Sequence, residues 1–111
     1  MPNSDLASRN CSPIAAGTAA LDSKTVADHL KSLHNWSYAG GEISKAFSFK
    51  NYYETMAFVN AVAWIAHQQD HHPDMEVGYN KCTVRYSTHS VGGLSENDFI
   101  CAAKVDQLIK N

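Results

Sequence analysis

Hydrophobic and polar residues alternate along the chain with two different periods, one typical of helices and one typical of strands. The first helical stretch begins after Asp22 or Ser23, either of which can cap a helix. Val26, Leu30 and Leu33 then recur at i, i+4 and i+7, which is one helical face. This spacing predicts a first amphipathic helix that packs one side against a core.

Two extended segments follow this helix, separated by a tight-turn signal. Residues 36–39 read as a short strand and residues 43–49 as a longer one, with Gly40-Gly41 between them. Lys45 interrupts the apolar side of the second segment, so we expect one end of that strand to be exposed. The pair predicts an antiparallel hairpin.

The longest helix is predicted to begin after Asn51, with Glu54 completing a capping-box-like start. It must end near Gln69 or Asp70, because Pro73 cannot continue a helix and favours an extended residue before it. Its apolar face is broad enough to cover a sheet. That face comprises Met56, Phe58, Val59, Val62, Ala63, Ile65 and Ala66.

A second hairpin and a last helix complete the pattern. Residues 75–79 and 82–88 read as strands around Asn80-Lys81, and Ser95 is the predicted cap of the final helix. The apolar stripe of this helix contains Cys101, Ala102, Val105, Leu108 and Ile109. The order α-β-β-α-β-β-α predicts an α+β fold, with a four-stranded antiparallel sheet and three helices on one face.

The first 20 residues are rich in Ser, Ala and Asn and show no amphipathic period. We interpret residues 1–20 as a flexible tail that the fold does not need, and residues 21–111 as a single domain. A chain of 111 residues can hold one small core without disulfides or a structural metal.

Composition narrows the class of protein. The formal net charge of −2 argues against nucleic-acid binding, and no apolar run is long enough to span a bilayer. The N-terminus lacks the basic-then-apolar pattern of a secretory signal. Three widely spaced cysteines form no CxxC and suggest free thiols in a reducing compartment, so we expect a cytoplasmic protein.

Histidines concentrate at the two places where chemistry is most plausible. Asp70-His71-His72-Pro73 lies at the end of the long helix, and Thr88-His89 lies at the end of the last strand, before Gly92-Gly93. Histidines at a helix end can simply satisfy its free carbonyls and dipole. The second cluster favours a shared site, since imidazole moves protons near neutral pH.

Two further interpretations stay open on spacing alone. Asp98 can orient the ring of His89, or it can close the start of the last helix as part of a Ser95-x-x-Asp98 capping box. His67, His71 and His89 offer three nitrogens for a catalytic zinc, although no HExxH motif is present and His71 lies where the helix ends. We therefore predict no metal site.

Four blocks in order and spacing resemble the pterin-4a-carbinolamine dehydratase family. They are Asp70-His71-His72-Pro73, Tyr79-Asn80-Lys81, Ser87-Thr88-His89 and Gly93-Leu94-Ser95-x-x-Asp98. Trp36 and Phe47-x-Phe49 also match the family pattern, and the similarity covers roughly residues 22–110. A lone His-His-Pro is weak evidence, whereas four linked blocks are specific.

The resemblance implies a lyase that removes water from 4a-hydroxytetrahydropterin to form quinonoid dihydropterin, in the recycling of tetrahydropterin for an aromatic amino-acid hydroxylase. It implies that neither a redox cofactor nor a metal is needed. It also assigns roles by position: His71 and His89 as the acid–base histidines, His72 as the pterin-orienting residue and Asp98 as the partner of His89.

The remaining expected substrate contacts also follow from the resemblance. They are Asp70, Pro73, Ser87, Thr88 and Trp36, the last of which can equally be a core residue. Many relatives carry a glutamate where this chain has His67, which either binds the pterin in its place or is a partly exposed helix residue.

The family also suggests a homodimer or homotetramer. The alternative function is a protein-interaction, assembly or transcriptional co-regulator module on the same fold.

Overall fold

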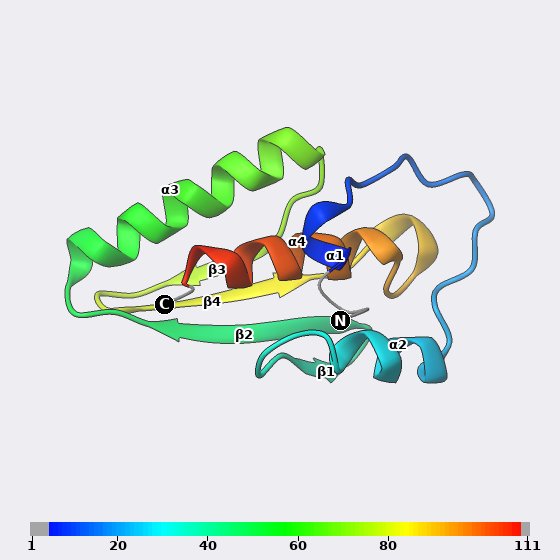
Figure 1. The fold of residues 1–111 in the computed structure, drawn as a ribbon, viewed down its shortest axis with the longest axis horizontal. Coiled ribbons are helices and arrows are strands. Elements are labelled where there is room, and N and C mark those ends of the chain that lie inside the picture. The colour runs from blue at the N-terminus through cyan, green and yellow to red at the C-terminus, as the bar shows by residue number, and fades with distance from the viewer. Residues whose placement is uncertain (1–4, 110–111) are drawn as a thin grey trace.

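The structure, a computed structural model, describes residues 5–109 and confirms the predicted order of elements (Figure 1). The elements are α1 (Asp5–Ser8), α2 (Ser23–Leu30), β1 (Ser37–Ala39), β2 (Glu42–Ser48), α3 (Tyr52–Gln69), β3 (Asp74–Val77), β4 (Lys81–Tyr86), the 3-10 helix η2 (His89–Val91) and α4 (Glu96–Leu108). Two short elements, α1 and η2, were not predicted. The α-β-β-α-β-β-α order accounts for all the others.

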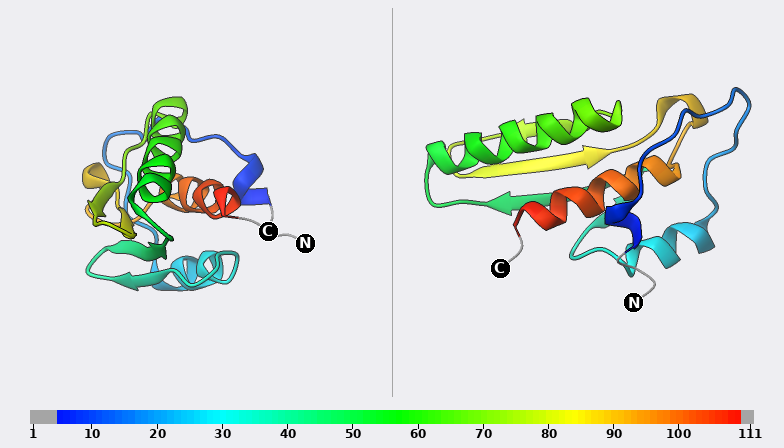
Figure 2. Two further views of the ribbon diagram at one scale, coloured as in Figure 1. Left: turned by 90° about the vertical axis from the view of Figure 1, so that its left-hand side faces the viewer. Right: turned by 45° about the horizontal axis from the view of Figure 1, so that its top comes forward.

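The four strands form one antiparallel sheet in the order β1-β2-β4-β3. Figure 2 shows α2, α3 and α4 on the same side of this sheet, as predicted from the sequence. The long strand β4 pairs with both β2 and β3, so it lies in the interior of the sheet. Its last residue, Tyr86, is directly opposite Ile43. β4 therefore leads from the centre of the core to the loop that carries Thr88 and His89.

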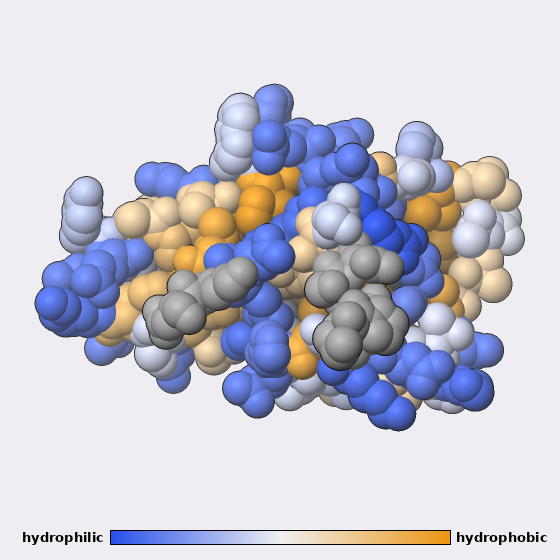
Figure 3. All heavy atoms as spheres, in the orientation of Figure 1, coloured by the Kyte–Doolittle hydropathy of each residue, from blue (hydrophilic) through white to orange (hydrophobic). Residues whose placement is uncertain are grey.

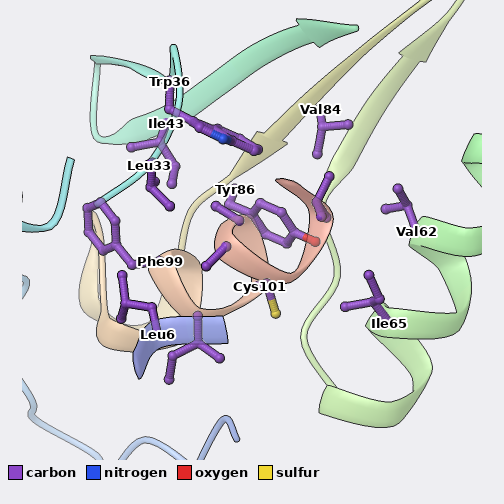
Figure 4. Close-up of a cluster of buried hydrophobic side chains, with 14 of the residues drawn as sticks. Leu6, Leu33, Trp36, Ile43, Val62, Ile65, Val84, Tyr86, Phe99 and Cys101 are labelled. Carbon is purple, nitrogen blue, oxygen red and sulfur yellow. The ribbon is translucent and has the colours of Figure 1, made fainter. Parts of the chain in front are cut away.

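Alternation along β4 separates the two faces of the sheet. Cys82, Val84 and Tyr86 are fully buried beneath the helices, whereas Thr83 and Arg85 lie on the other face and are partly exposed. Figure 4 shows Tyr86 in the same cluster as side chains from α3, α4 and the segment before β1. This period of two matches the prediction for a half-buried strand.

The ends of α3 are defined by local chemistry that the sequence indicated. At its start, the Asn51 side chain accepts a hydrogen bond from the Glu54 N–H at 2.9 Å, and Glu54 Oε1 accepts one from the Lys50 N–H at 3.1 Å. At its end, Asp70 adopts a left-handed conformation with φ 53°. This reversal turns the chain back towards the sheet.

The buried face of α3 is narrower than predicted. Thr55, Phe58, Val62, Ile65 and Ala66 are buried, while Met56 and Val59 are half-buried and Ala63 is exposed. The buried positions include Phe58, whose ring lies 4.7 Å from that of Phe47 in β2 and 5.0 Å from that of Phe49.

Lys45 does not mark an exposed strand end. Its side chain is on the helix side of the sheet, 17% exposed, and Nζ lies 2.9 Å from Oδ1 of Asp106, which is 9% exposed. The same carboxylate accepts a hydrogen bond from Trp36 Nε1 at 3.0 Å. The strand tolerates a lysine on its apolar side because α4 supplies the opposite charge.

Residues 5–12, which we call the N-terminal strap, correct the expectation of a flexible tail over residues 1–20. Leu6 is 4% exposed and belongs to the core cluster, and Lys104 Nζ donates to the carbonyl of Ala7 at 2.8 Å. The strap packs against α4 through one buried leucine. A single buried residue gives no hydrophobic period, so the sequence pattern does not predict this packing. Residues 1–4 lie outside the described part of the chain.

Candidate active site

The end of α3 brings His71 into the interior. The His71 N–H donates to the carbonyl of Ala66 at 3.2 Å, which continues the capping of the helix past Asp70. The His71 side chain is only 12% exposed. Its ring lies parallel to that of Tyr86, with centroids 5.9 Å apart and an interplanar angle of 7°. The ring is therefore held between the core and the surface.

Asp98 is the partner of His71. Its carboxylate is fully buried, and Oδ1 lies 2.6 Å from His71 Nε2. The other oxygen, Oδ2, accepts hydrogen bonds from the Ser95 N–H at 2.9 Å and the Thr88 hydroxyl at 2.8 Å. The capping box of α4 is thus formed, and the same carboxylate also orients a histidine. The capping box and the contact with His71 are compatible, because His71 uses Oδ1 and the Ser95 N–H uses Oδ2.

The expected contact between Asp98 and His89 is not formed, and this part of the prediction is wrong. Thr88 is in an extended conformation and directs its hydroxyl towards Asp98 and Ser95. His89 begins η2 and is exposed, and both oxygens of the Asp98 carboxylate are hydrogen-bonded to other partners.

The His71–Asp98 contact determines the protonation of the imidazole. Burial of the ring lowers its pKa, but the hydrogen bond and the negative charge of Asp98 outweigh this effect. Cys11 and Asp70 add smaller contributions in the same direction, so the pKa of His71 is raised above its ordinary value. The imidazolium form of His71 is therefore favoured, whereas a buried histidine without a carboxylate partner would favour the neutral form.

The loop after β4 is held by backbone and hydroxyl contacts. The Thr88 N–H donates to the carbonyl of Gly93 at 2.8 Å, and the Thr88 and Ser95 hydroxyls lie 2.7 Å apart. Gly92 ends η2 with φ 70°, a conformation that glycine adopts without strain. Thr88 stays a predicted substrate contact, and its hydroxyl is hydrogen-bonded to the carboxylate of Asp98.

The other predicted site residues differ in exposure. His72, Asp70 and Ser87 are exposed, and Pro73 is half-buried. His67 is exposed on α3, with its ring 5.4 Å from that of Trp64.

Trp36 is 8% exposed, and its ring lies 6.2 Å from that of Phe47 and 6.3 Å from that of Tyr86. These contacts, together with its hydrogen bond to Asp106, favour the core-packing interpretation of Trp36.

The zinc arrangement considered from the sequence is not formed. Within residues 5–109, no group of three or more His, Cys, Asp or Glu side chains is placed to hold a metal ion. Nε2 of His71 is occupied by Asp98, and His67 and His89 are not gathered around it.

Two residues near His71 were not predicted as part of its surroundings. Tyr86 stacks on the ring, and its buried hydroxyl has no hydrogen-bond partner within the described residues. Burial, together with nearby Cys101, Cys11 and Asp98, raises the pKa of this hydroxyl. Strand alternation could have placed Tyr86 inward, whereas nothing in the sequence indicates that Cys11 approaches His71.

The fold and the site together define an α+β domain in which a buried carboxylate orients a partly buried histidine where α3, β4 and α4 meet. The family model described as pterin 4 alpha carbinolamine dehydratase matches residues 19–108. The chain belongs to this family. No helix within residues 5–109 is long and apolar enough to cross a membrane.

Close relatives span nearly the whole chain. A protein of Nitrosospira multiformis is 58% identical, covering 96% of this chain and 94% of its own length. A protein of Nitrosomonas eutropha is 61% identical, and the match covers 95% of this chain and 94% of that protein's own length. Both carry the provisional name pterin-4-alpha-carbinolamine dehydratase.

Two solved structures share the fold. A transcriptional coactivator/pterin dehydratase from Brucella melitensis is 28% identical, with a TM-score of 0.78 over 80% of this chain and 97% of its own. A pterin dehydratase-like RuBisCO assembly factor of the alpha-carboxysome is 22% identical, with a TM-score of 0.58, and the match covers 71% of this chain and 92% of that structure's chain. At this identity, the second structure shows only that the two proteins share a fold.

Proposed function

We propose that the protein dehydrates 4a-hydroxytetrahydropterin to quinonoid dihydropterin by histidine acid–base catalysis. The observation that carries this proposal is the 2.6 Å contact between His71 and the buried Asp98, in a chain of the pterin dehydratase family. The step belongs to the recycling of tetrahydropterin after aromatic amino-acid hydroxylation. It requires a proton for the departing 4a-hydroxyl and the removal of the proton on N5.

His71 is suited to both proton transfers. Its Nε2 is anchored on Asp98, while Nδ1 makes no hydrogen bond to the described residues. In the charged imidazolium, Nδ1 can give its proton to the 4a-hydroxyl, which leaves as water. The neutral ring that results keeps its Nε2 proton towards Asp98 and can accept a proton at Nδ1. Asp98 thereby fixes which nitrogen exchanges protons.

His89 and His72 complete the proposed set from two loops. His89 follows β4 and is the second acid–base residue, while His72 precedes β3 and orients the pterin. Both side chains are exposed, so a bound pterin can reach them. We also propose that the pterin contacts Asp70, Pro73, Ser87 and His67. Thr88 contributes through its hydrogen bond to Asp98.

Stopped-flow measurement with chemically generated 4a-hydroxytetrahydropterin tests this function. Wild-type protein should accelerate the dehydration well above the uncatalysed rate, and a rate equal to that background would refute the proposal. Positioned acid–base groups contribute about 10² to 10⁴-fold. The double variant H71A/H89A should therefore lose at least about 10²-fold in kcat, whereas H72A should mainly raise KM.

The matched control is H34A. His34 is an exposed histidine between α2 and β1, and within residues 5–109 its one hydrogen bond is from its backbone N–H to Asp106. Its replacement should leave kcat and KM unchanged. An equal loss in H34A and H71A/H89A would mean that the histidine effects are not specific to the site.

We also propose self-association into a homodimer or homotetramer. Among the strands of the described residues, β3 is at an edge of the sheet and pairs with β4 alone. On the outer side of α3, Tyr53 is 81% exposed and Trp64 is 60% exposed. Figure 3 shows further apolar side chains between α3 and α4 on the face it presents. Light scattering after size-exclusion chromatography tests this, and a monomer at micromolar concentration would contradict it.

A protein-interaction role is the second candidate. The Brucella melitensis structure is named both as a transcriptional coactivator and as a pterin dehydratase, and its 28% identity extends over most of this chain. If the role is present and separate from catalysis, a pull-down should recover the same partner with wild type and with H71A/H72A/H89A. Loss of the partner in the triple variant would place binding at the histidine site instead.

A further inference from the structure

The N-terminal strap is fixed to two helices around Cys11. The Cys11 N–H donates to Oε1 of Gln69 at the end of α3, at 2.7 Å. The next residue, Ser12, exchanges two hydrogen bonds with the side chain of Asn97 in α4, at 3.1 and 2.9 Å. The backbone on both sides of Cys11 is therefore held, and its side chain has a defined neighbour.

That neighbour is a second thiol, 90 residues further along the chain. Sγ of Cys11 and Sγ of Cys101 are 3.6 Å apart. Cys11 is partly exposed, whereas Cys101 is fully buried in the core cluster drawn in Figure 4. A disulfide needs a separation of about 2.0 Å, so the sulfurs must approach by roughly 1.5 Å. Small side-chain rotations supply a movement of this size.

The two thiols are electrostatically different. The hydrogen bond with Cys101 lowers the pKa of Cys11 against the opposing effects of burial and of the negative charge of Asp98, and His71 and Lys104 lower it further. The same hydrogen bond and burial raise the pKa of Cys101. Cys11 is thus the accessible thiol that ionises first, and Cys101 is a protected thiol beside it. This is the arrangement of an attacking and a resolving cysteine.

We propose that Cys11 and Cys101 form an oxidant-sensitive modification site that takes a peroxide and closes to a disulfide. The Cys11 thiolate attacks one peroxide oxygen, the O–O bond breaks, and the product is a sulfenic acid and one water after protonation. The Cys101 thiol then attacks the sulfenic sulfur, an S–S bond forms and a second water leaves. In sum, two thiols and one hydrogen peroxide give one disulfide and two waters.

The disulfide would join the strap covalently to α4, one turn after Asp98. Cys82 offers an internal comparison: it is fully buried in β4, and no thiol contacts it within the described residues. It should remain a free thiol under the same treatment. The inference stands apart from the dehydratase proposal, because its readout is thiol content rather than activity.

The test is hydrogen peroxide treatment of the folded full-length protein, followed by catalase, unfolding and alkylation with N-ethylmaleimide. Untreated protein should take three alkyl groups, as its three cysteines require, and treated protein should take one. Trypsin places each cysteine in a separate peptide, namely 10–24, 82–85 and 86–104. The expected product is peptide 10–24 linked to peptide 86–104, sensitive to dithiothreitol.

Variants assign the two roles. C101S should stop at a Cys11 sulfenic acid that dimedone traps, C11S should keep both of its remaining thiols, and C82S should form the disulfide as wild type does. Three alkylated cysteines after treatment, a link through peptide 82–85, or a bond only between two chains would overturn the proposal. The wild-type mass and peptide map decide the question even if a variant fails to fold.

Discussion

Replacing Asp98 by asparagine removes the charge that orients His71 while keeping the size of the side chain. In the wild type, Oδ2 accepts from Ser95 and Thr88, and Oδ1 accepts from His71 Nε2 at 2.6 Å. An asparagine oxygen can keep the contacts to Ser95 and Thr88. Its amide nitrogen then faces His71, which must turn its ring proton to Nδ1 and remain neutral.

The size of the effect follows from burial. Asp98 is fully buried and the His71 side chain is 12% exposed, so the pair is shielded from solvent. A hydrogen bond to a charged group contributes about 1.5–3 kcal/mol, and losing one partner of a buried pair costs about 3–5 kcal/mol. Because asparagine preserves the other contacts, we expect D98N to lower the free energy of unfolding by about 2–4 kcal/mol at about pH 5.5.

The cost should depend on pH in a defined direction. The pKa of His71 is raised in the folded state, so the stability gained from the pair is fully present below the unfolded pKa of about 6.5. It is lost as the pH rises through the folded pKa. The difference between wild type and D98N should therefore shrink between about pH 5.5 and about pH 9.

Urea unfolding at both pH values measures this difference. The matched control is D106N, whose buried carboxylate pairs with Lys45. D106N leaves the contact between His71 and Asp98 in place, so its cost should hardly change between the two pH values. A cost of D98N that is equal at both pH values, or larger at about pH 9, would refute the proposed charge pairing of His71.

Three further changes test the packing around the site, each by urea unfolding. L6A should cost about 2–4 kcal/mol, since Leu6 is buried in the core, and a cost below about 0.5 kcal/mol would mean that the strap is not part of the fold. K45M should cost about 3 kcal/mol, because it leaves the Asp106 carboxylate without its cation. The control K24M replaces an exposed lysine and should have no measurable effect on stability. Equal losses of stability in K45M and K24M would contradict this reasoning. G92A should cost about 1–2 kcal/mol because of its φ of 70°, and an unchanged stability would exclude strain there.

Much of the fold could be predicted because its signals are local. Asn51 and Glu54 define the start of α3, Pro73 limits its end, and alternation along β4 separates inner from outer side chains. Each of these depends on residues within a few positions of one another. The helix and strand order followed, and so did the placement of His71 and His89 at the ends of elements.

The predictions for Lys45 and for the N-terminal residues failed because they depended on partners far away in the sequence. Lys45 is buried because Asp106 lies opposite, and the strap packs because α4 offers a site for Leu6. Neither partner can be identified from spacing, since 61 residues separate the first pair.

The sequence by itself determined which residue types were available for proton transfer and at which ends of elements they lie. Only the tertiary structure decided that Asp98 serves His71 rather than His89, because the direction of a side chain depends on the register of β4 and the turn of the loop after it. It also brought Cys11 to Cys101 across 90 residues. The contact between Cys11 and Cys101 forms because the strap packs against α4, and no pattern of neighbouring residues predicts that packing.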